Sequence, residues 1–330
     1  MGRALLGLAV ALAVVDANPY GHEPYPVFWA VNGPNASAFA PNGAVNIAQY
    51  GIKTNNYTIC GGMTGALMPS LSPDGAPIRG GVPQSANFSL DAFLSGLSKA
   101  LTTRIPDAQY DGLAVFDFEK FTPIWSEDTS AGGWHSKAYR VYSMKLVQQA
   151  HPSWSRAEVE AEAKSQFEAA AIQLFVSALE QGKKLRPKAL WGFYGMREPL
   201  HQQLHWLHVV AVNKVLAVCH VATLAAAIVH SGSNASKLLP IWKASRALFP
   251  SIYISSPKTA KSHVESTIAL SLKMAEKARH RSSGKGRIPV YPFGWECCER
   301  AIVSRLANSG LHIVGVIEYL DPAMMRLPLC

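Results

Sequence analysis

Short apolar runs alternate with longer helix-like segments along most of this chain, and this alternation constrains its fold more than any other feature. Apolar runs typical of strands lie at 25–31, 112–119, 189–196, 247–255, 287–293 and 311–319. Segments with helical spacing of apolar residues lie within 79–101, 151–187, 263–280 and 297–310. Strands that alternate with helices build a parallel sheet, either closed into a barrel or doubly wound. Because no strong internal boundary is visible, the sequence predicts a single α/β domain.

The clearest helix follows Ser155. Acidic Glu158 lies near its front, and basic Lys183 and Lys184 lie near its end, which is the charge distribution that a helix dipole favours. Pro187 cannot continue a helix and marks the stop. The sequence therefore predicts a long helix between Ser155 and Pro187.

Two carboxylates, Asp117 and Glu119, directly follow the apolar run Leu113–Phe116. This run is too short for a helix and follows Gly112, so a short buried strand is expected. Side chains two residues apart on a strand share a face, which places the two carboxyls roughly 6 to 7 Å apart at their backbones. Like charges this close resist ionising together, so one carboxyl is expected to keep its proton and to suit general acid catalysis. The alternative is a solvated strand end with two unrelated acids.

The position of Asp117 and Glu119 also bears on the fold class. Catalytic groups of parallel barrels gather at the C-terminal ends of the strands. These carboxylates come at the C-terminal end of a predicted strand, which favours a TIM-like barrel over a doubly wound sheet.

The N-terminal segment has the pattern of a secretory signal peptide. A basic Arg3 precedes an apolar stretch from Ala4 to Val15, and small residues surround Ala17. Cleavage after Ala17 is expected, which gives a signal peptide at 1–17 and a secreted, extracellular domain at 18–330. Secretion makes the N-x-S/T acceptors candidate glycosylation sites on surface loops: Asn35, Asn56, Asn87 and Asn234.

The chain has five cysteines, at positions 60, 219, 297, 298 and 330. An odd number in an oxidising compartment leaves at least one thiol unpaired within the chain. The adjacent pair is not expected to bond to itself, given disulfide geometry. No Cys or Cys/His set has a convincing metal spacing, so no metal and no other cofactor is expected.

The formal net charge of +9 points to a polyanionic partner. Many basic residues fall in the stretch 273–287, which is alternatively a solvated helix end and loop. Nucleic acid is the other common polyanion, but no nucleic-acid-binding motif is recognised and the signal peptide argues against it. A polyanion other than nucleic acid is therefore favoured.

Several motifs occur in an order that resembles the hyaluronidase family of glycoside hydrolases, especially the compact arthropod venom type. They are GGVPQ, VFDFEKFTPIW, HPSWSRAEVEAEAKSQFE, GKKLRPKALWGFYG, ALFPSIYIS and IPVYPF, and the match runs through most of 24–320. The resemblance implies a distorted TIM-like barrel with a long polyanion-binding groove. It also implies cleavage of β-1,4 bonds after N-acetylglucosamine in hyaluronan, and often in chondroitin, with retention. In that mechanism the acetamido oxygen of the substrate attacks C1, so the enzyme supplies no nucleophile.

The resemblance assigns roles to individual residues. Glu119 matches the proton donor of the family, and Asp117 matches the partner that orients and supports the acetamido group as it becomes cationic. Tyr194 and Tyr253 match tyrosines that line the acetamido subsite. The family places a tryptophan on its last strand, where this sequence reads VGVIEYLDP, and Tyr319 is the aromatic residue that could take over the stacking face.

The sequence departs from the family pattern in its cysteines and in the segment 197–233. Cys330 lies about where a late family cysteine belongs, but its early partner is missing, and so is a second family bridge. The segment 197–233 is apolar and rich in histidine, and it replaces an expected Cys- and Asn-rich loop. It fits a helical insert over the groove, a membrane-associating hairpin or a translated intron. Its histidines at 201, 205 and 208 have helical spacing, but no carboxylate or cysteine nearby completes a metal site.

The sequence therefore predicts a monomeric, secreted endo-β-N-acetylhexosaminidase that acts on hyaluronan or chondroitin. Two alternatives stay open. One is a glycosaminoglycan-binding protein with impaired catalysis, suggested by the missing tryptophan and the foreign segment. The other is a chitinase-like hydrolase, because DGLAVFDFE resembles the chitinase pattern, although its first strand acid is replaced by Ala114 and chitin carries no charge.

Overall fold

The computed structural model describes residues 27–30, 52–53, 56–125, 133–195, 236–252, 260–278, 288–294 and 316–318. Its parallel strands are β1 (Val27–Ala30), β2 (Ile52–Lys53), β3 (Tyr57–Cys60), β6 (Leu113–Phe116), β7 (Leu190–Phe193), β8 (Phe293–Gly294) and β9 (Val316–Glu318). A small antiparallel hairpin joins β4 (Ser70–Leu71) and β5 (Pro77–Ile78). The helices are α2 (Gly62–Gly65), α3 (Leu90–Arg104), α4 (Gly133–Ala150), α5 (Arg156–Leu185) and α8 (Ala260–Lys277), with a further helix at 236–244.

The parallel strands form one connected series of pairings. One sheet has the order β3-β6-β7 and the other has the order β2-β1-β9-β8. Single parallel bridges join the two sheets: Tyr194 pairs with Phe249, and Ser251 pairs with Phe293. The segment around 248–251 therefore lies between β7 and β8, and the predicted parallel α/β class is confirmed.

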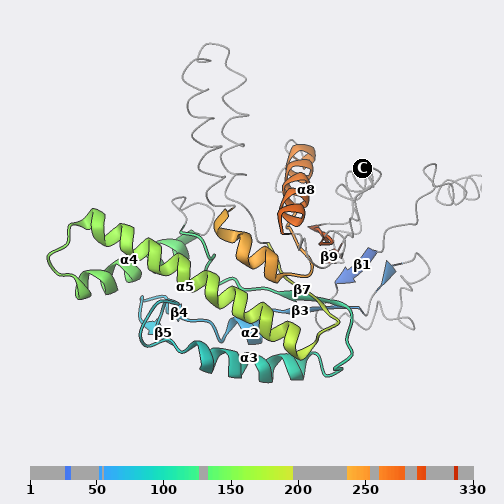
Figure 1. The fold of residues 1–330 in the computed structure, drawn as a ribbon, viewed down its shortest axis with the longest axis horizontal. Coiled ribbons are helices and arrows are strands. Elements are labelled where there is room, and N and C mark those ends of the chain that lie inside the picture. Colours follow the sequence, from blue (N-terminus) through green and yellow to red (C-terminus); the bar gives the residue numbers. More distant parts are fainter. Residues whose placement is uncertain are drawn as a thin grey trace, which may run out of the picture.

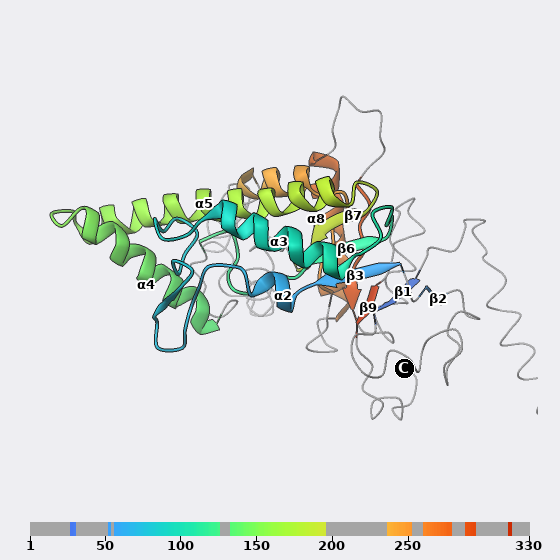
Figure 2. The same ribbon diagram turned by 90° about the horizontal axis from the view of Figure 1, so that it is seen from below.

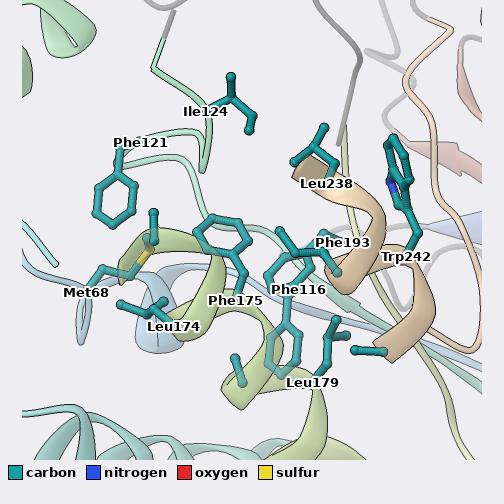
Figure 3. Close-up of a cluster of buried hydrophobic side chains, with 14 of the residues drawn as sticks. Met68, Phe116, Phe121, Ile124, Leu174, Phe175, Leu179, Phe193, Leu238 and Trp242 are labelled. Carbon is teal, nitrogen blue, oxygen red and sulfur yellow. The ribbon is translucent and has the colours of Figure 1, made fainter. Parts of the chain in front are cut away.

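Helices α3 and α5 lie side by side over one face of the strands, and α4 folds back along α5 (Figure 1). The corner between α4 and α5 lies at the end of the molecule away from the strands (Figure 2). A helix-side cluster of buried apolar residues fills the layer between helices and sheet (Figure 3). Its largest members include Met68, Phe116, Phe121, Ile124, Leu174, Phe175, Leu179, Phe193, Leu238 and Trp242.

The opposite face of the strands carries a second buried cluster, called here the opposite-face cluster. Each of its members in the described part of the chain comes from a strand or from a bridge segment rather than from a helix. They are Leu113, Val115, Ala247, Phe249, Tyr291 and Phe293, with Tyr57, Ile59, Leu190 and Tyr194 packed against them. The strands are thus apolar on both faces, as parallel sheets usually are.

The long predicted helix is confirmed as α5, with Ser155 as its N-cap. The backbone N–H of Ser155 donates to Glu158 Oε2 at 2.8 Å, and Ser155 Oγ accepts from the backbone N–H of Glu158. This capping box satisfies N–H groups that the first helical turn leaves without partners. At the other end Arg186 is the C-cap, directly before Pro187.

The predicted strand at 247–255 forms only isolated bridges among its described residues. Pro250 lies in the middle of this run and has no N–H for a ladder. The run at 112–119 is a strand only over Leu113–Phe116.

Sequence reasoning missed β3, α4 and the helix at 236–244. Strand β3 is four residues long and follows a polar stretch, so it carries little periodic signal. Its burial depends on its pairing with β6, which is distant in sequence. The predicted helix at 297–310 lies outside the described residues.

Gly182 makes room for the indole of Trp191, and this contact yields a stability prediction. A Cβ at Gly182 would lie 2.8 to 3.0 Å from three atoms of that fully buried ring. Helix propensity alone favours alanine over glycine by about 1 kcal/mol. Overpacking costs about 1–3 kcal/mol, so we expect Gly182→Ala to lower the free energy of unfolding in denaturant titrations.

Gly96 in α3 is the matched control, because a Cβ there would meet only the flexible end of Leu67 at 3.0 Å. Gly96→Ala is expected to be neutral or stabilising. A Gly182→Ala variant as stable as Gly96→Ala would contradict the packing at Trp191.

Candidate active site

The C-terminal ends of β3, β6 and β7 bring Gly61, Asp117 and Tyr194 to one level. The strands are paired in register, with Cys60 opposite Phe116 and Phe116 opposite Phe193. The parallel hydrogen bonding continues one residue beyond the ends of β6 and β7. The backbone N–H of Asp117 donates to the carbonyl of Cys60 at 3.2 Å, and that of Tyr194 donates to the carbonyl of Phe116 at 2.9 Å.

The alternation of side chains along β6 indicates on which face of the sheet the two carboxylates lie. Val115 belongs to the opposite-face cluster, whereas Phe116 belongs to the helix-side cluster. Phe118 also packs on the helix side, with its ring 5.6 Å from Phe175. The alternation therefore assigns Asp117 and Glu119 to the opposite face, above Val115. Asp117 is half-buried and Glu119 is exposed.

The strand ends earlier than the sequence suggested. We expected both carboxylates on one strand, but β6 stops at Phe116 and the acids lie on the segment that follows it. The neighbouring strand β3 stops at Cys60 and continues into the turn of α2. The ladder on this side therefore ends at Asp117, because β3 turns away from it.

Gly61 leaves room beside Asp117. A Cβ at Gly61 would lie 3.4 Å from Asp117 Oδ2 and 3.5 Å from its Cβ. The carboxylate therefore packs directly over the end of β3. Sequence reasoning missed Gly61, although a Gly-Gly pair after an apolar run is a usable signal for a close approach of backbone and side chain.

Tyr194 is held by groups from two further strand positions. Its hydroxyl donates to Ser251 Oγ at 3.3 Å, and its ring meets the ring of Phe293 edge-on at 5.2 Å between centroids. Ser251 is buried, and it was not singled out from the sequence. Tyr253 and Tyr319, the other two predicted substrate-binding residues, lie outside the described residues.

The structure thus places Asp117 and Tyr194, two of the five predicted site residues, at neighbouring strand ends, and Glu119 follows Asp117 two residues further along the chain. Carboxylates over an apolar floor, with a phenol one strand away, can donate a proton and support a developing positive charge. Burial raises the pKa of the Tyr291 phenol in that floor.

In the part of the chain that the structure describes, no group of three or more His, Cys, Asp and Glu side chains is placed to hold a metal ion. No helix in the same part is long and apolar enough to cross a membrane. The three histidines at 201, 205 and 208 fall outside it.

A sequence profile described as Hyaluronidase matches residues 45–311. Hyaluronidase-1 of Bos taurus is 30% identical over 286 residues, which are 82% of this chain and 57% of the relative. Hyaluronidase-1 of Homo sapiens is 33% identical over 68% of this chain and 47% of its own length. Chondroitin hydrolase of Caenorhabditis elegans is 38% identical over 36% of this chain and 24% of its own length. The chain spans about half the length of the mammalian relatives that it matches.

The fold is similar to that of bee venom hyaluronidase, solved in complex with a hyaluronic acid tetramer. The TM-score is 0.66 at 21% sequence identity, over 90% of this chain and 91% of the bee protein. At this identity the likeness shows the fold.

Cys60, whose carbonyl anchors Asp117, gives a chemical prediction. Burial raises the pKa of its thiol to about 12 from an ordinary 9.0, so its reactive thiolate is about a thousandfold rarer at pH 8. We expect iodoacetamide to label Cys60 at least roughly 100-fold more slowly in the folded protein than in denaturant, as read by peptide mass spectrometry. Equal labelling rates in the two states would contradict the burial of this strand end.

Proposed function

This chain belongs to the hyaluronidase family of glycoside hydrolases, and we propose that it is a secreted endo-β-N-acetylhexosaminidase that hydrolyses β-1,4 bonds of hyaluronan, and of chondroitin. One observation carries the proposal: half-buried Asp117 and Tyr194 leave neighbouring strands at one level, with Glu119 two residues further on. The substrates named for its relatives, hyaluronic acid and chondroitin, support the same class of polysaccharide.

The strand pairings support a closed barrel. Strand β2 pairs with β1, and β3 pairs with β6, all in parallel. Only three residues separate β2 from β3, whereas parallel neighbours need a crossover of about a dozen residues or more. We therefore propose that the two short strands are successive parts of one strand position, which would close the series of pairings into a ring. In such a barrel the opposite-face cluster, built from strand and bridge residues, would be the packed interior.

In the proposed reaction Glu119 gives its proton to the oxygen of the leaving sugar. Its exposure leaves it open to a polymer that lies across the strand ends. The acetamido oxygen of the substrate attacks C1 on the opposite side, so the configuration is retained after water opens the cyclic intermediate. No protein nucleophile is needed, which fits a pair of acids on a single chain segment.

Asp117 supports the acetamido group as its nitrogen becomes positive. Its carboxylate is half-buried beside Gly61, and a charge in a partly dry site is worth more than one in water. Tyr194, fixed by Ser251, lies at the same level and fits the wall of the acetamido subsite. Tyr253 and Tyr319 are proposed to add further substrate contacts. The net charge of +9 raises the local concentration of a polyanion.

The first test compares purified protein and its Glu119→Gln variant on hyaluronan, chondroitin and chitin oligomers. We expect the native protein to shorten hyaluronan or chondroitin. The variant should be roughly 10²- to 10⁴-fold slower, because glutamine keeps the shape of the side chain and removes the proton source. Glu160→Gln on the exposed face of α5 is the matched control and should keep full activity.

Three outcomes would reject this assignment. Hyaluronan binding without shortening would favour a binding protein with impaired catalysis. Release from chitin alone would favour a chitinase-like enzyme. Near-native turnover by Glu119→Gln would remove Glu119 from the donor role.

The second test addresses the substrate-assisted step. Asp117→Asn should lower kcat strongly and leave KM nearly unchanged, because its charge is needed only as the acetamido nitrogen becomes cationic. A thiazoline analogue of the cyclised sugar should bind the native enzyme much more tightly than the plain sugar. Asp111→Asn, an exposed acid just before β6, is the control. If Asp117→Asn keeps its kcat and the analogue shows no preference, the assisted mechanism is wrong for this chain.

A further inference from the structure

Glu168 is a buried carboxylate on α5 that contacts two segments from distant parts of the chain. It is 6% exposed. Its Oε1 accepts from the backbone N–H of Trp125 at 3.0 Å, and its Oε2 accepts from Lys237 Nζ. Lys237 is partly exposed, at 38% for its side chain. Both oxygens of the carboxylate are thus used, as a buried charge requires.

The first contact fixes the segment that leaves the active site. Residues 120–125 follow Glu119 directly, and the segment is packed down on α5. The ring of Phe121 lies 5.5 Å from that of Phe167, and the ring of Trp125 lies 5.8 Å from the same ring. The bond from Trp125 to Glu168 attaches this segment to α5 six residues after Glu119.

The second contact fixes the other side of the same site. Lys237 lies in the helix at 236–244, whose Leu238 and Trp242 belong to the helix-side cluster, which also contains Phe193 (Figure 3). This helix leads within a few residues to Ser251, the partner of Tyr194. A shift of the helix would therefore displace the acetamido side of the site.

We propose that Glu168 is a positioning residue that sets the Glu119 segment and the Ser251 segment relative to each other through Trp125 and Lys237. The inference rests on the proposed glycosidase function, since the two segments are those that carry its proton donor and its tyrosine wall. Glu168 touches no reacting atom. Its effect is geometric, and small displacements of reacting groups are costly to catalysis.

The contact between Glu168 and Lys237 leads to a specific prediction for variants in which glutamine replaces one or both residues. In Glu168→Gln one amide oxygen still accepts from Trp125, but the amide NH₂ then faces the ammonium of Lys237, donor against donor. In the double variant Glu168→Gln/Lys237→Gln, the amide NH₂ at position 168 donates to the amide oxygen at position 237, and the neutral pair is satisfied. Lys237→Gln alone leaves the buried Glu168 carboxylate without its cation and should also be harmful, whereas the same change in the Glu168→Gln background should rescue that variant.

The experiment measures kcat and KM on hyaluronan for the native protein, both single variants and the double variant. We expect Glu168→Gln to lower kcat roughly 10- to 100-fold with KM within about twofold, and the double variant to recover most of the loss. The pair of exposed Glu180 and half-buried Lys183 on the same helix, 2.6 Å apart, is the matched control. Its double glutamine variant should leave kcat unchanged.

Hydrogen exchange separates this inference from the proposed function. Peptides covering 118–125 and 244–252 should exchange faster in Glu168→Gln and return to native protection in the double variant, whether or not the protein cleaves hyaluronan. An inactive native protein with this exchange pattern would reject the glycosidase and keep the coupling. Unchanged kcat and exchange in Glu168→Gln would overturn the proposal. So would faster exchange throughout α5 without rescue, because that result indicates a purely structural role.

Discussion

The in-register parallel pairing of β3, β6 and β7 is the constraint on which the site depends. Parallel strands expose their next residues at one level, and the alternation of side chains sorts those residues between two faces. The helix side receives Phe116 and Phe118. The opposite face receives Asp117, which packs over Gly61 and lies one strand from Tyr194. A slip of one residue would send the carboxylate into the apolar layer under α5, where it would have no water.

The helix-side layer holds this register in place. Phe118 lies between the two acids in sequence, and its ring packs on those of Phe93, Phe175 and Phe193. Helix α5, which carries Phe175, also carries Glu168, the buried carboxylate that joins the segment after the acids to the helix at 236–244. Helix α5 thus stabilises the sheet and positions the groups at its edge. The same close packing against α5 therefore both stabilises the sheet and fixes the segment that carries the two acids.

Local signals were sufficient for several parts of this description. The serine cap and the proline stop predicted α5 closely, because caps act within one turn. The apolar run Leu113–Phe116 predicted β6, and the two acids after it gave the candidate site. Strand β3 was missed because it is held in the sheet by pairing with β6. Ser251 was missed because its partner lies 57 residues away in sequence. Glu168 was missed because its two partners lie 43 and 69 residues away. The extension of β6 to Glu119 was wrong, because strand length depends on where the neighbouring strands stop.

The sequence by itself determined the α/β class, helix α5, strand β6 and the pair of acids that follows it. These follow from periodicity, capping and spacing, which are properties of neighbouring residues, whereas the role of Tyr194 came from the family resemblance. Only the tertiary structure decided where β6 ends, that Asp117 packs against Gly61, and that Tyr194 is held by Ser251. It also decided that one buried carboxylate on α5 contacts both sides of the site. Such contacts join residues that are far apart in the chain, and no local pattern encodes which of them meet.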